Sequence, residues 1–410
     1  MSGQAPVSLD QALERLLENA APLAGRETLP LLSCLGRYAG AGITASLDIP
    51  PFDNAPLDGF ALFHGDLEGA GENTPARLKV VSARYAGDPP AKALKRGECV
   101  RIMTGAAMPE GADCVAPYEA TDNGEEYVKV PFSLKAYQNY RRKGEDIKAG
   151  QQLLAQGDCI GPGSIAALAS QGAASLAVYP RVKVGILSTG SELVLSSEAL
   201  GGGALPAGKL YDSNRALLGG RILELGAEPC FAPAAPDDAA ALAALAERLL
   251  AQCHGLITTG GVSVGDRDFM PEVGKRLHAE ALFRGIAMKP GGWATAFLAG
   301  GKIMLCLSGN PGAASMTFDL LGAPLIRRLG GASAVRPVWR PVVLKTPPPV
   351  KAGGTSRYMY ALDEGDGARL ITGGFHGAQA GADTIIHIGA GAACLGARRL
   401  GAFFAPQRDF

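Results

Sequence analysis

The chain has 410 residues, of which 47% are hydrophobic, and its 39 basic and 39 acidic side chains leave no net charge. A chain of this length is expected to form about two to four domains and to bury its cores without disulfides or structural metals. It has no long basic run that could follow a nucleic-acid backbone, which excludes nucleic acid and anionic membranes from the expected partners.

The eight cysteines are scattered, with no CxxC pair and no histidine at ligand spacing from any of them. This pattern disfavours zinc and iron–sulfur sites. Cysteines inside apolar runs, such as Cys306, are expected to be small buried hydrophobes. Residues 1–17 lack the pattern of a secretion signal, and charged residues interrupt the apolar run 239–251. We therefore expect a soluble protein in a reducing cytoplasm.

The N-terminal region is predicted to begin with a helix and to continue as short strands. Ser8-Leu9-Asp10-Gln11 forms a capping box in front of leucines at helical spacing. From about residue 50 to 140, short β-rich runs such as 77–83 and 127–130 alternate with Gly/Pro clusters. This change predicts a small inserted β domain. Helical spacing returns between residues 150 and 174.

From residue 181 the pattern becomes strand, loop and helix in repetition. The predicted strands are 182–187, 230–231, 256–259 and 303–307, and the predicted helices are 210–225, 237–250, a segment after Asp268, and 311–329. Such alternation predicts a parallel sheet covered on both faces by helices. After Gly330, short strands with Gly- and Pro-rich turns predict a β-rich C-terminal domain of about 80 residues.

Three loops, 188–192, 258–268 and 308–312, each follow a predicted strand. They should converge at one edge of the sheet, because the carboxyl ends of parallel strands lie at the same edge. Ligands of such sheets bind beyond these ends. The middle loop combines three glycines with hydroxyls, which suits a phosphate, and with Asp266 and Asp268, which offer the oxygen ligands that Mg²⁺ prefers. The alternative is a plain strand-to-helix connection, since Gly and Asp are ordinary turn residues.

The third loop leads into a helix whose first residue is predicted to be Pro311. Free N–H groups and the helix dipole there would favour an anion by about 0.3–1 kcal/mol. The alternative is an ordinary helix start capped by Asn310. Lys289, beside a Pro-Gly-Gly turn, and Arg357 are candidate oxyanion ligands, and the alternative for each is a solvated surface cation.

Taken together, these segments resemble the molybdopterin molybdotransferases, the MoeA family that includes the C-terminal domain of gephyrin. The matching motifs are Asp53-Asn54 through Asp58-Gly59-Phe60-Ala61, Ile102-Met103-Thr104-Gly105, Gly144-Glu145-Asp146-Ile147, Ser188-Thr189-Gly190 with Glu192-Leu193, Thr259 to Gly265, Lys289-Pro290-Gly291 and Gly309-Asn310-Pro311. They occur in the order of the family and cover nearly the whole chain.

The pattern and the resemblance together predict a multidomain α/β fold. Its central part, at residues 181–330, is expected to be a three-layer α/β/α molybdopterin-binding domain with a mainly parallel sheet. An N-terminal region at 1–180 carries the inserted β domain at about 50–140, and a β-rich domain occupies 331–410. The resemblance also implies an elongated homodimer with a composite site, in which the α/β domain of one subunit faces the inserted β domain of the other.

The implied reaction takes adenylylated molybdopterin and molybdate, inserts molybdenum between the two dithiolene sulfurs, and releases AMP in a Mg²⁺-dependent step. The resemblance assigns catalysis to Asp58, Thr104, Glu192, Asp237 and Asp268, with the last three as Mg²⁺ ligands; Asp238 fits the alignment as well as Asp237 does. Implied substrate-binding residues are Ser188, Thr189, Gly190, Gly260, Gly261, Ser263, Gly265, Lys289, Pro290, Gly291, Ser308, Gly309, Asn310, Pro311 and Arg357.

The sequence also departs from the family. Ser308 stands where a proline is usual, Gly292 where a lysine is usual, and Gly377-Ala378 where paired serines are common. Arg284 lies one residue out of register with a position that is often basic. These changes remove polar and cationic side chains from the site proposed for molybdate. An enzyme with altered kinetics or a specialised paralogue therefore remains an alternative.

Two other functions remain open from the sequence. One is the related adenylyltransferase that makes adenylylated molybdopterin, since it shares the α/β module, although the additional N- and C-terminal parts argue against it. The other is a carrier or scaffold that binds molybdopterin without turnover. The preference for molybdate over tungstate and the enzymes that receive the product are not encoded in any motif.

Overall fold

The computed structural model describes residues 5–89, 92–195, 205–233, 235–262, 268–345, 355–371, 381–389 and 398–400. The chain forms two compact units. The first comprises Met1–Ala41, Gln156–Pro162 and Ser175–Phe410, and the second comprises Gly42–Ala155 and Gly163–Ala174. Boundaries near residues 180 and 330 therefore do not separate the two units, because the first unit also takes in the N-terminal segment.

The first unit is built on a six-stranded sheet that is mainly parallel. Its strand order is β13 (Glu228–Phe231), β10 (Lys183–Ser188), β14 (Gly255–Thr259), β18 (Lys302–Leu307), β17 (Thr295–Ala299) and β15 (Glu280–Arg284). The first four strands are parallel, and β17 and β15 continue the sheet in antiparallel pairing. The sequence does not predict this antiparallel edge, since glycine-rich turns interrupt residues 280–301.

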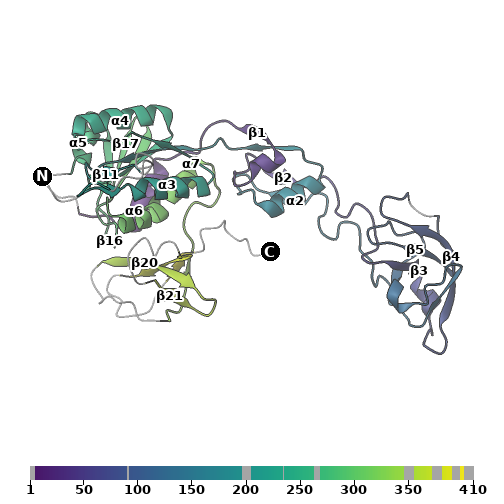
Figure 1. Ribbon diagram of the computed structural model, residues 1–410. Helices are drawn as coiled ribbons and strands as arrows, with labels where there is room; N and C mark the ends of the chain where they lie inside the picture. The colour runs from purple at the N-terminus through teal and green to yellow at the C-terminus, as the bar shows by residue number, and fades with distance from the viewer. Residues whose placement is uncertain are drawn as a thin grey trace. The chain divides into compact units, whose positions relative to one another are not determined.

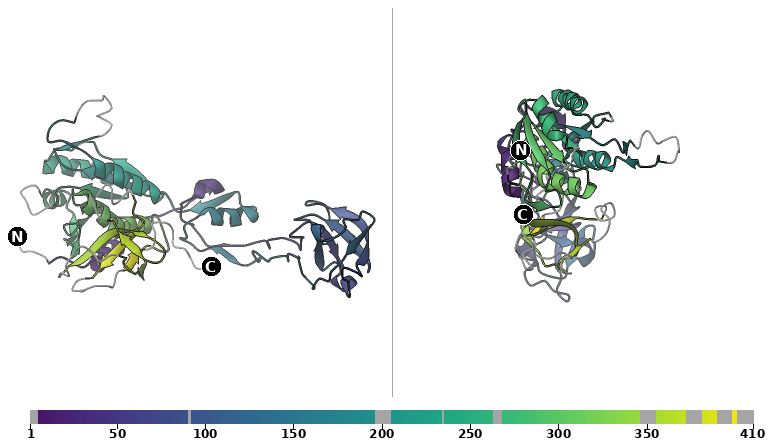
Figure 2. Two further views of the ribbon diagram at one scale, coloured as in Figure 1. Left: turned by 60° about the horizontal axis from the view of Figure 1, so that its bottom comes forward. Right: turned by 90° about the vertical axis from the view of Figure 1, so that its left-hand side faces the viewer.

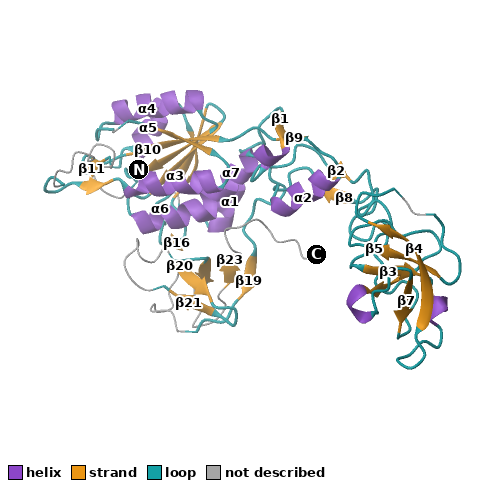
Figure 3. Ribbon diagram, turned by 45° about the vertical axis from the view of Figure 1, so that its right-hand side comes forward, coloured by secondary structure: helices purple, strands orange, loops and turns teal. Residues whose placement is uncertain are grey.

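Helices cover both faces of this sheet, as Figure 3 shows. The helices are α1 (Leu9–Glu18), α3 (Ser213–Glu224), α4 (Ala239–Gln252), α5 (Met270–Arg276), α6 (Pro311–Thr317) and α7 (Ala323–Leu329). One core cluster joins the sheet to α1, α3, α6 and α7, and a second cluster joins the opposite face to α4 and α5. The predicted three-layer α/β/α fold with a mainly parallel sheet is thus confirmed.

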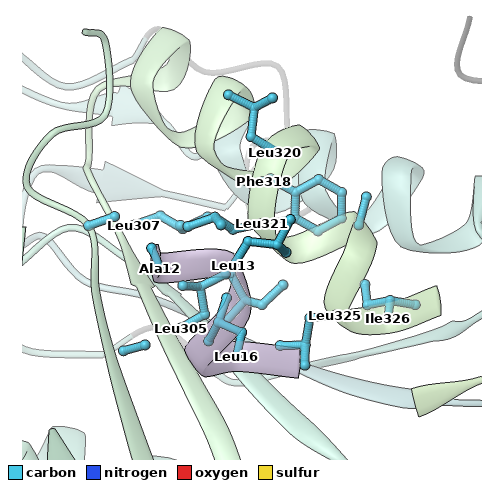
Figure 4. Packing of buried hydrophobic residues seen from close by; sticks show 14 of the residues in the cluster. Ala12, Leu13, Leu16, Leu305, Leu307, Phe318, Leu320, Leu321, Leu325 and Ile326 are labelled. Atoms are coloured by element: carbon cyan, nitrogen blue, oxygen red, sulfur yellow. The ribbon is translucent and has the colours of Figure 1, made fainter. Parts of the chain in front are cut away.

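The first helix explains why the N-terminal segment belongs to this unit. The capping box is present, with Ser8 Oγ accepting from the backbone N–H of Gln11. The apolar face of α1 buries Leu13 and Leu16 among residues of β18 and of the 311–329 helical segment, as seen in Figure 4. Burial of each leucine contributes about 1.5–3 kcal/mol.

The helix predicted at 311–329 is divided in two by a π-helical turn, Phe318–Gly322. Pro324 lies in the first turn of α7 and has no N–H to donate to the carbonyl four residues earlier, so the regular α ladder is interrupted there. All five residues of the π turn are buried. A π turn in such a place is often associated with a functional site.

The C-terminal part forms a second sheet that packs against the helical segment 311–329. Its order is β16 (Met288–Lys289), β20 (Ser356–Asp363), β22 (Thr384–Ile388), β23 (Arg398–Leu400) and β19 (Trp339–Pro341), with β21 (Ala368–Leu370) paired to β20. Its yellow strands lie next to the green helices in Figure 2. The edge strand β16 comes from the α/β region, and it pairs in parallel with β20 (Figure 1).

The second unit holds the predicted small β domain. Its five-stranded sheet has the order β6 (Cys114–Pro117), β3 (Gly59–Leu62), β5 (Glu98–Ile102), β4 (Ala76–Arg84) and β7 (Tyr127–Val130). The unit also contains the short pair β2 (Ile43–Thr44) and β8 (Gln152–Leu154), and most of α2 (Pro162–Ser170). None of the helices in the described ranges combines the length and apolar character needed to cross a membrane.

Candidate functional site

The three loops predicted to converge do meet at the carboxyl edge of the central sheet. Thr189 N–H donates to the carbonyl of Thr259 at 2.8 Å, and Gly260 N–H donates to the carbonyl of Leu307 at 3.1 Å. Parallel pairing of β10, β14 and β18 produces this arrangement, because it brings their carboxyl ends to the same edge.

Close backbone packing requires glycine in this rim. Gly260 has a φ of 85°, and a Cβ there would lie 2.5 Å from the carbonyl oxygen of Thr189. Gly190 has a φ of 143°, and a Cβ there would lie 2.6 Å from a carboxylate oxygen of Glu192. Gly260 thus allows its loop to touch the loop of Thr189, whereas Gly190 leaves room for the Glu192 carboxylate within one loop. Ser263, Gly265 and Asp266, predicted in the same rim, lie outside the described residues.

Three buried polar atoms at this rim have no hydrogen-bond partner among the described residues: Ser188 Oγ, Thr259 Oγ1 and Asn214 Oδ1. Ser188 and Thr259 are register partners on adjacent parallel strands, so their side chains share one face of the sheet. Asn214 lies at the start of α3, and its Nδ2 donates to the carbonyl of Gly309 at 2.9 Å. An unsatisfied buried polar group costs about 1–3 kcal/mol, so these atoms are suited to receive a ligand.

Asn214 is a site candidate that no sequence motif predicted. Its spacing in the sequence could have identified it, because Asn214, Leu218 and Ile222 are four residues apart and lie on the buried face of α3. A polar side chain on an apolar helical stripe needs a partner.

The structure distinguishes the two adjacent aspartates that the alignment left open. Asp238 is the N-cap of α4, and its Oδ1 accepts from the backbone N–H of Ala241 at 2.8 Å. The carboxylate of Asp237 instead accepts from the N–H of Ser191 at 3.3 Å. Asp237 and Glu192 therefore flank the same loop, which supports Asp237 as the ligand candidate.

Asp268 lies on the chain just before α5. Its side chain reaches the surface but is crowded by neighbouring atoms, and this partial burial raises its pKa. A hydrogen bond from the backbone of Met270 and the charge of Arg284 act in the opposite direction. A cation beside Asp268 would favour the ionised carboxylate and so oppose the effect of burial.

The described residues contain no group of three His, Cys, Asp or Glu side chains that could hold a metal. Mg²⁺ commonly binds through one or two carboxylates and completes its shell with water and substrate phosphates. Glu192 and Asp237, on either side of Ser191, fit that donor set. The assignment of Asp268 to the same ion stays a prediction.

Two of the predicted cations are neighbours. Lys289 on β16 and Arg357 on β20 are partners in the parallel pairing, so both side chains lie on the same face of the C-terminal sheet. Neither forms an ion pair within the described ranges. Like charges at directly paired positions repel each other, so an anion bound between them would stabilise the pair.

The turn after Lys289 packs too closely for larger residues at two of its glycines. Gly291 has a φ of 93°, and a Cβ there would lie 2.1 Å from Thr317 Oγ1, so the turn packs directly on α6. At Gly292, where the family usually has lysine, a Cβ would lie 2.9 Å from the carbonyl oxygen of Met288 and 3.1 Å from that of Ile286. The backbone of this turn therefore leaves no space for the side chain.

The loop before α6 is capped by the protein itself. Asn310 Oδ1 accepts from the N–H groups of Gly312 at 3.0 Å and Ala313 at 3.2 Å, and Ser308 Oγ accepts from the N–H of Asn310 at 3.2 Å. The alternative of an ordinary capped helix start is therefore observed, with Pro311 as its first residue. A substrate role for residues 308–311 stays a prediction.

Asp58 and Thr104 meet within the second unit. Asp58 Oδ1 accepts from both the backbone N–H and the hydroxyl of Thr104, each at 2.7 Å. These two hydrogen bonds, with a smaller contribution from Arg101, lower the pKa of Asp58. Its carboxylate is thus held ionised and oriented.

Comparisons with known proteins agree over most of the chain. Residues 7–172 match the family model "MoeA N-terminal region (domain I and II)", and residues 185–328 match "Probable molybdopterin binding domain". A molybdopterin molybdenumtransferase of Staphylococcus aureus is 35% identical over 334 residues, which cover 81% of this chain and 78% of the relative. The Bacillus subtilis protein of the same name is 35% identical over 326 residues, covering 78% and 74% respectively.

Solved structures with a similar fold include two moeA proteins. A molybdopterin biosynthesis moeA protein from Pyrococcus horikoshii has a TM-score of 0.76 and 26% identity, covering 97% of this chain and 98% of its own. Another structure, titled with the moea protein from Pyrococcus horikosii, has a TM-score of 0.73 and 30% identity, covering 98% of this chain and 100% of its own.

Proposed function

The chain belongs to the molybdopterin molybdenumtransferase family, and on that premise we propose that it inserts molybdenum from molybdate into adenylylated molybdopterin and releases AMP. The family acts in molybdenum cofactor biosynthesis, and this chain is accordingly an enzyme of that process. The alternative of a carrier without turnover is not favoured.

The pairing of Lys289 with Arg357 is the observation that carries the molybdate part of the proposal. Molybdate is a dianion, and two adjacent cations without a carboxylate partner in the described ranges match its charge. The guanidinium offers several N–H donors in a fixed plane, while the ammonium is a compact charge on a flexible stem. Together they can bind two oxygens of one tetrahedral oxyanion.

The converging loops support binding of the nucleotide-linked pterin. The hydroxyls of Ser188 and Thr259 and the amide oxygen of Asn214 have no partner among the described residues, and they belong to the edge where parallel sheets bind ligands. Glu192 and Asp237 would hold Mg²⁺, and a bound Mg²⁺ supplies charge stabilisation to a departing phosphate. Asp268, the third predicted ligand, would be placed close to the same phosphates.

Asp58 and Thr104 fall in the second unit, away in sequence from the other candidates. We infer that they act in a composite site of a homodimer, facing the α/β part of the other subunit. The hydrogen bonds from Thr104 hold the carboxylate in one orientation, as a group that positions a substrate must be held. We also propose that the enzyme acts in the cytoplasm, in keeping with its seven free cysteines in the described ranges.

A single-turnover assay with adenylylated molybdopterin, Mg²⁺ and molybdate tests the proposal. We expect AMP release that depends on molybdate and a stoichiometric gain of molybdenum cofactor. Tight pterin binding without any AMP release would show a carrier. Adenylylation of molybdopterin by ATP would show the adenylyltransferase, a result that the matched N-terminal region of 7–172 does not favour.

A further inference from the structure

A buried hydrogen-bonded network connects α3, the π turn and the C-terminal sheet. Tyr360 Oη donates to Asp319 Oδ2 at 2.8 Å and also hydrogen-bonds Ser315 Oγ at 2.7 Å. Arg221 Nη2 lies 3.2 Å from the same carboxylate oxygen of Asp319. The Asp319 side chain is 2% exposed, so this carboxylate is held entirely by protein groups.

The helical segment 315–319 thereby contacts β20, which carries Arg357, and the turn that directly follows Lys289. Ser315 and Asp319 hold Tyr360 on β20, three residues after Arg357. Thr317 packs its hydroxyl against Gly291, two residues after Lys289, so closely that no Cβ fits there. The segment 315–319 therefore holds β20 and the turn after β16 at the same time.

We propose that Asp319 is a positioning residue for oxyanion binding: through Tyr360 it fixes β20 against the π turn, and this sets the spacing between Arg357 and Lys289. The inference rests on the proposed molybdotransferase function and deepens it, because Asp319 and Tyr360 are both buried and would act through the strand. Tyr360 and Arg357 lie on opposite faces of β20, so the effect passes through the strand and not through contact.

The charged and titratable groups around Asp319 come from two elements. Arg221 and Glu224 face it from α3, and Tyr360 faces it from β20. Burial raises the pKa of Asp319 to about 6, although Arg221 and the hydrogen bond from Tyr360 oppose the shift. The carboxylate therefore accepts a proton close to pH 6 and then binds Tyr360 and Arg221 less strongly. As the pH falls through 6, the contacts of Asp319 with Tyr360 and Arg221 should weaken, and molybdate binding should weaken as a result.

Asp319→Asn removes the charge and retains the shape of the side chain. We expect the apparent KM for molybdate in AMP release to rise at least fivefold at pH 7.5, with kcat changed less than twofold. The decline of molybdate affinity between pH 7 and 5.5 should be absent in the variant. Equilibrium dialysis with molybdate alone, without pterin, should give the same loss of affinity.

Two further variants separate positioning from stability. Glu224→Gln removes the other carboxylate that Arg221 contacts, at 2.8 Å, without touching Tyr360, and should leave the KM within twofold. Tyr360→Phe removes only the hydroxyl and should raise the KM in the same direction as Asp319→Asn. Circular dichroism and thermal melting establish that each variant is folded.

The outcomes distinguish the inference from the proposed function. Molybdate-dependent AMP release with an unchanged KM in both Asp319→Asn and Tyr360→Phe would overturn the positioning role and leave the function intact. An equal rise of KM in Glu224→Gln would also overturn it. A wild-type protein that neither binds molybdate nor releases AMP would overturn both.

Discussion

The proposed release of AMP depends on the carboxylate of Asp268, which lies just before α5. It was predicted as a Mg²⁺ ligand and is found exposed before α5, yet without two other carboxylates gathered around it in the described ranges. Sequence order identifies the residue, whereas the position of its oxygens depends on loop geometry that no local pattern encodes. The same holds for Asp237. The sequence could not separate it from Asp238, and the structure does so because Asp238 is the N-cap of α4.

We expect Asp268→Asn to abolish AMP release while the fold persists. The amide keeps the size of the side chain but is a weaker ligand for a hard cation. Because the side chain is exposed, the free energy of unfolding should change by no more than about 0.5 kcal/mol. AMP release in single turnover and urea unfolding measure the two effects. Wild-type rates in the variant would remove Asp268 from the mechanism.

Replacing Gly260 should affect the stability of the fold. Gly260→Ala should lower the free energy of unfolding by about 1–3 kcal/mol, because it combines a positive φ with a contact to the Thr189 carbonyl. The matched control is Gly220→Ala on α3, where a Cβ meets nothing within 4 Å. That change should instead stabilise by about 0.5–1 kcal/mol. Equal effects of the two substitutions in urea unfolding would contradict the close approach of the loops.

At the scale of elements, strands β10, β14 and β18 could be predicted because each is an apolar run of ordinary length. Parallel pairing then brought their loops together, as the general rule for such sheets requires. The two-residue strand β16 could not be predicted, since its partner β20 is more than 60 residues away in the sequence. The π turn escaped prediction for another reason: the apolar spacing of 311–329 is continuous, and only Pro324 marks the change.

The π turn carries a pH prediction. Asp319 has a folded pKa of about 6, raised by burial above its ordinary value of 3.8, so the folded protein holds a proton that the unfolded chain releases. Stability from this group is present below pH 4 and is lost as the pH rises through 6. Relative to Asp319→Asn, the wild type should lose on the order of 2–3 kcal/mol between pH 4 and 7.

Urea unfolding of both proteins across that pH range is the measurement. Parallel dependences of the free energy of unfolding on pH would show that Asp319 does not titrate differently in the folded state.

For the whole molecule, the motifs in family order predicted the fold class correctly, including the mainly parallel sheet and the β-rich parts. The attachment of the first helix to the α/β core was not visible, because a capping box and a leucine stripe do not specify which surface they cover. The packing of Leu16 among residues of β18 and the 311–329 segment settles that question.

The composite site that we propose for a homodimer can be tested by mixing two inactive variants. Asp58→Asn and Asp268→Asn should each be inactive, but a dimer containing one copy of each retains one intact site out of two. Random subunit exchange makes half of the dimers mixed, so about a quarter of wild-type activity should return. Coexpression followed by the AMP assay measures this recovery. Mixed dimers without any activity would place both residues in the same subunit's site.

The turn at Gly292 limits what this position can accept. Two backbone oxygens occupy the volume that a side chain would need, so Gly292→Lys cannot be accommodated unless the segment 286–288 moves. Such a movement would alter the approach to Lys289. Further positive charge beside Lys289 must therefore come from another strand, as it does from Arg357.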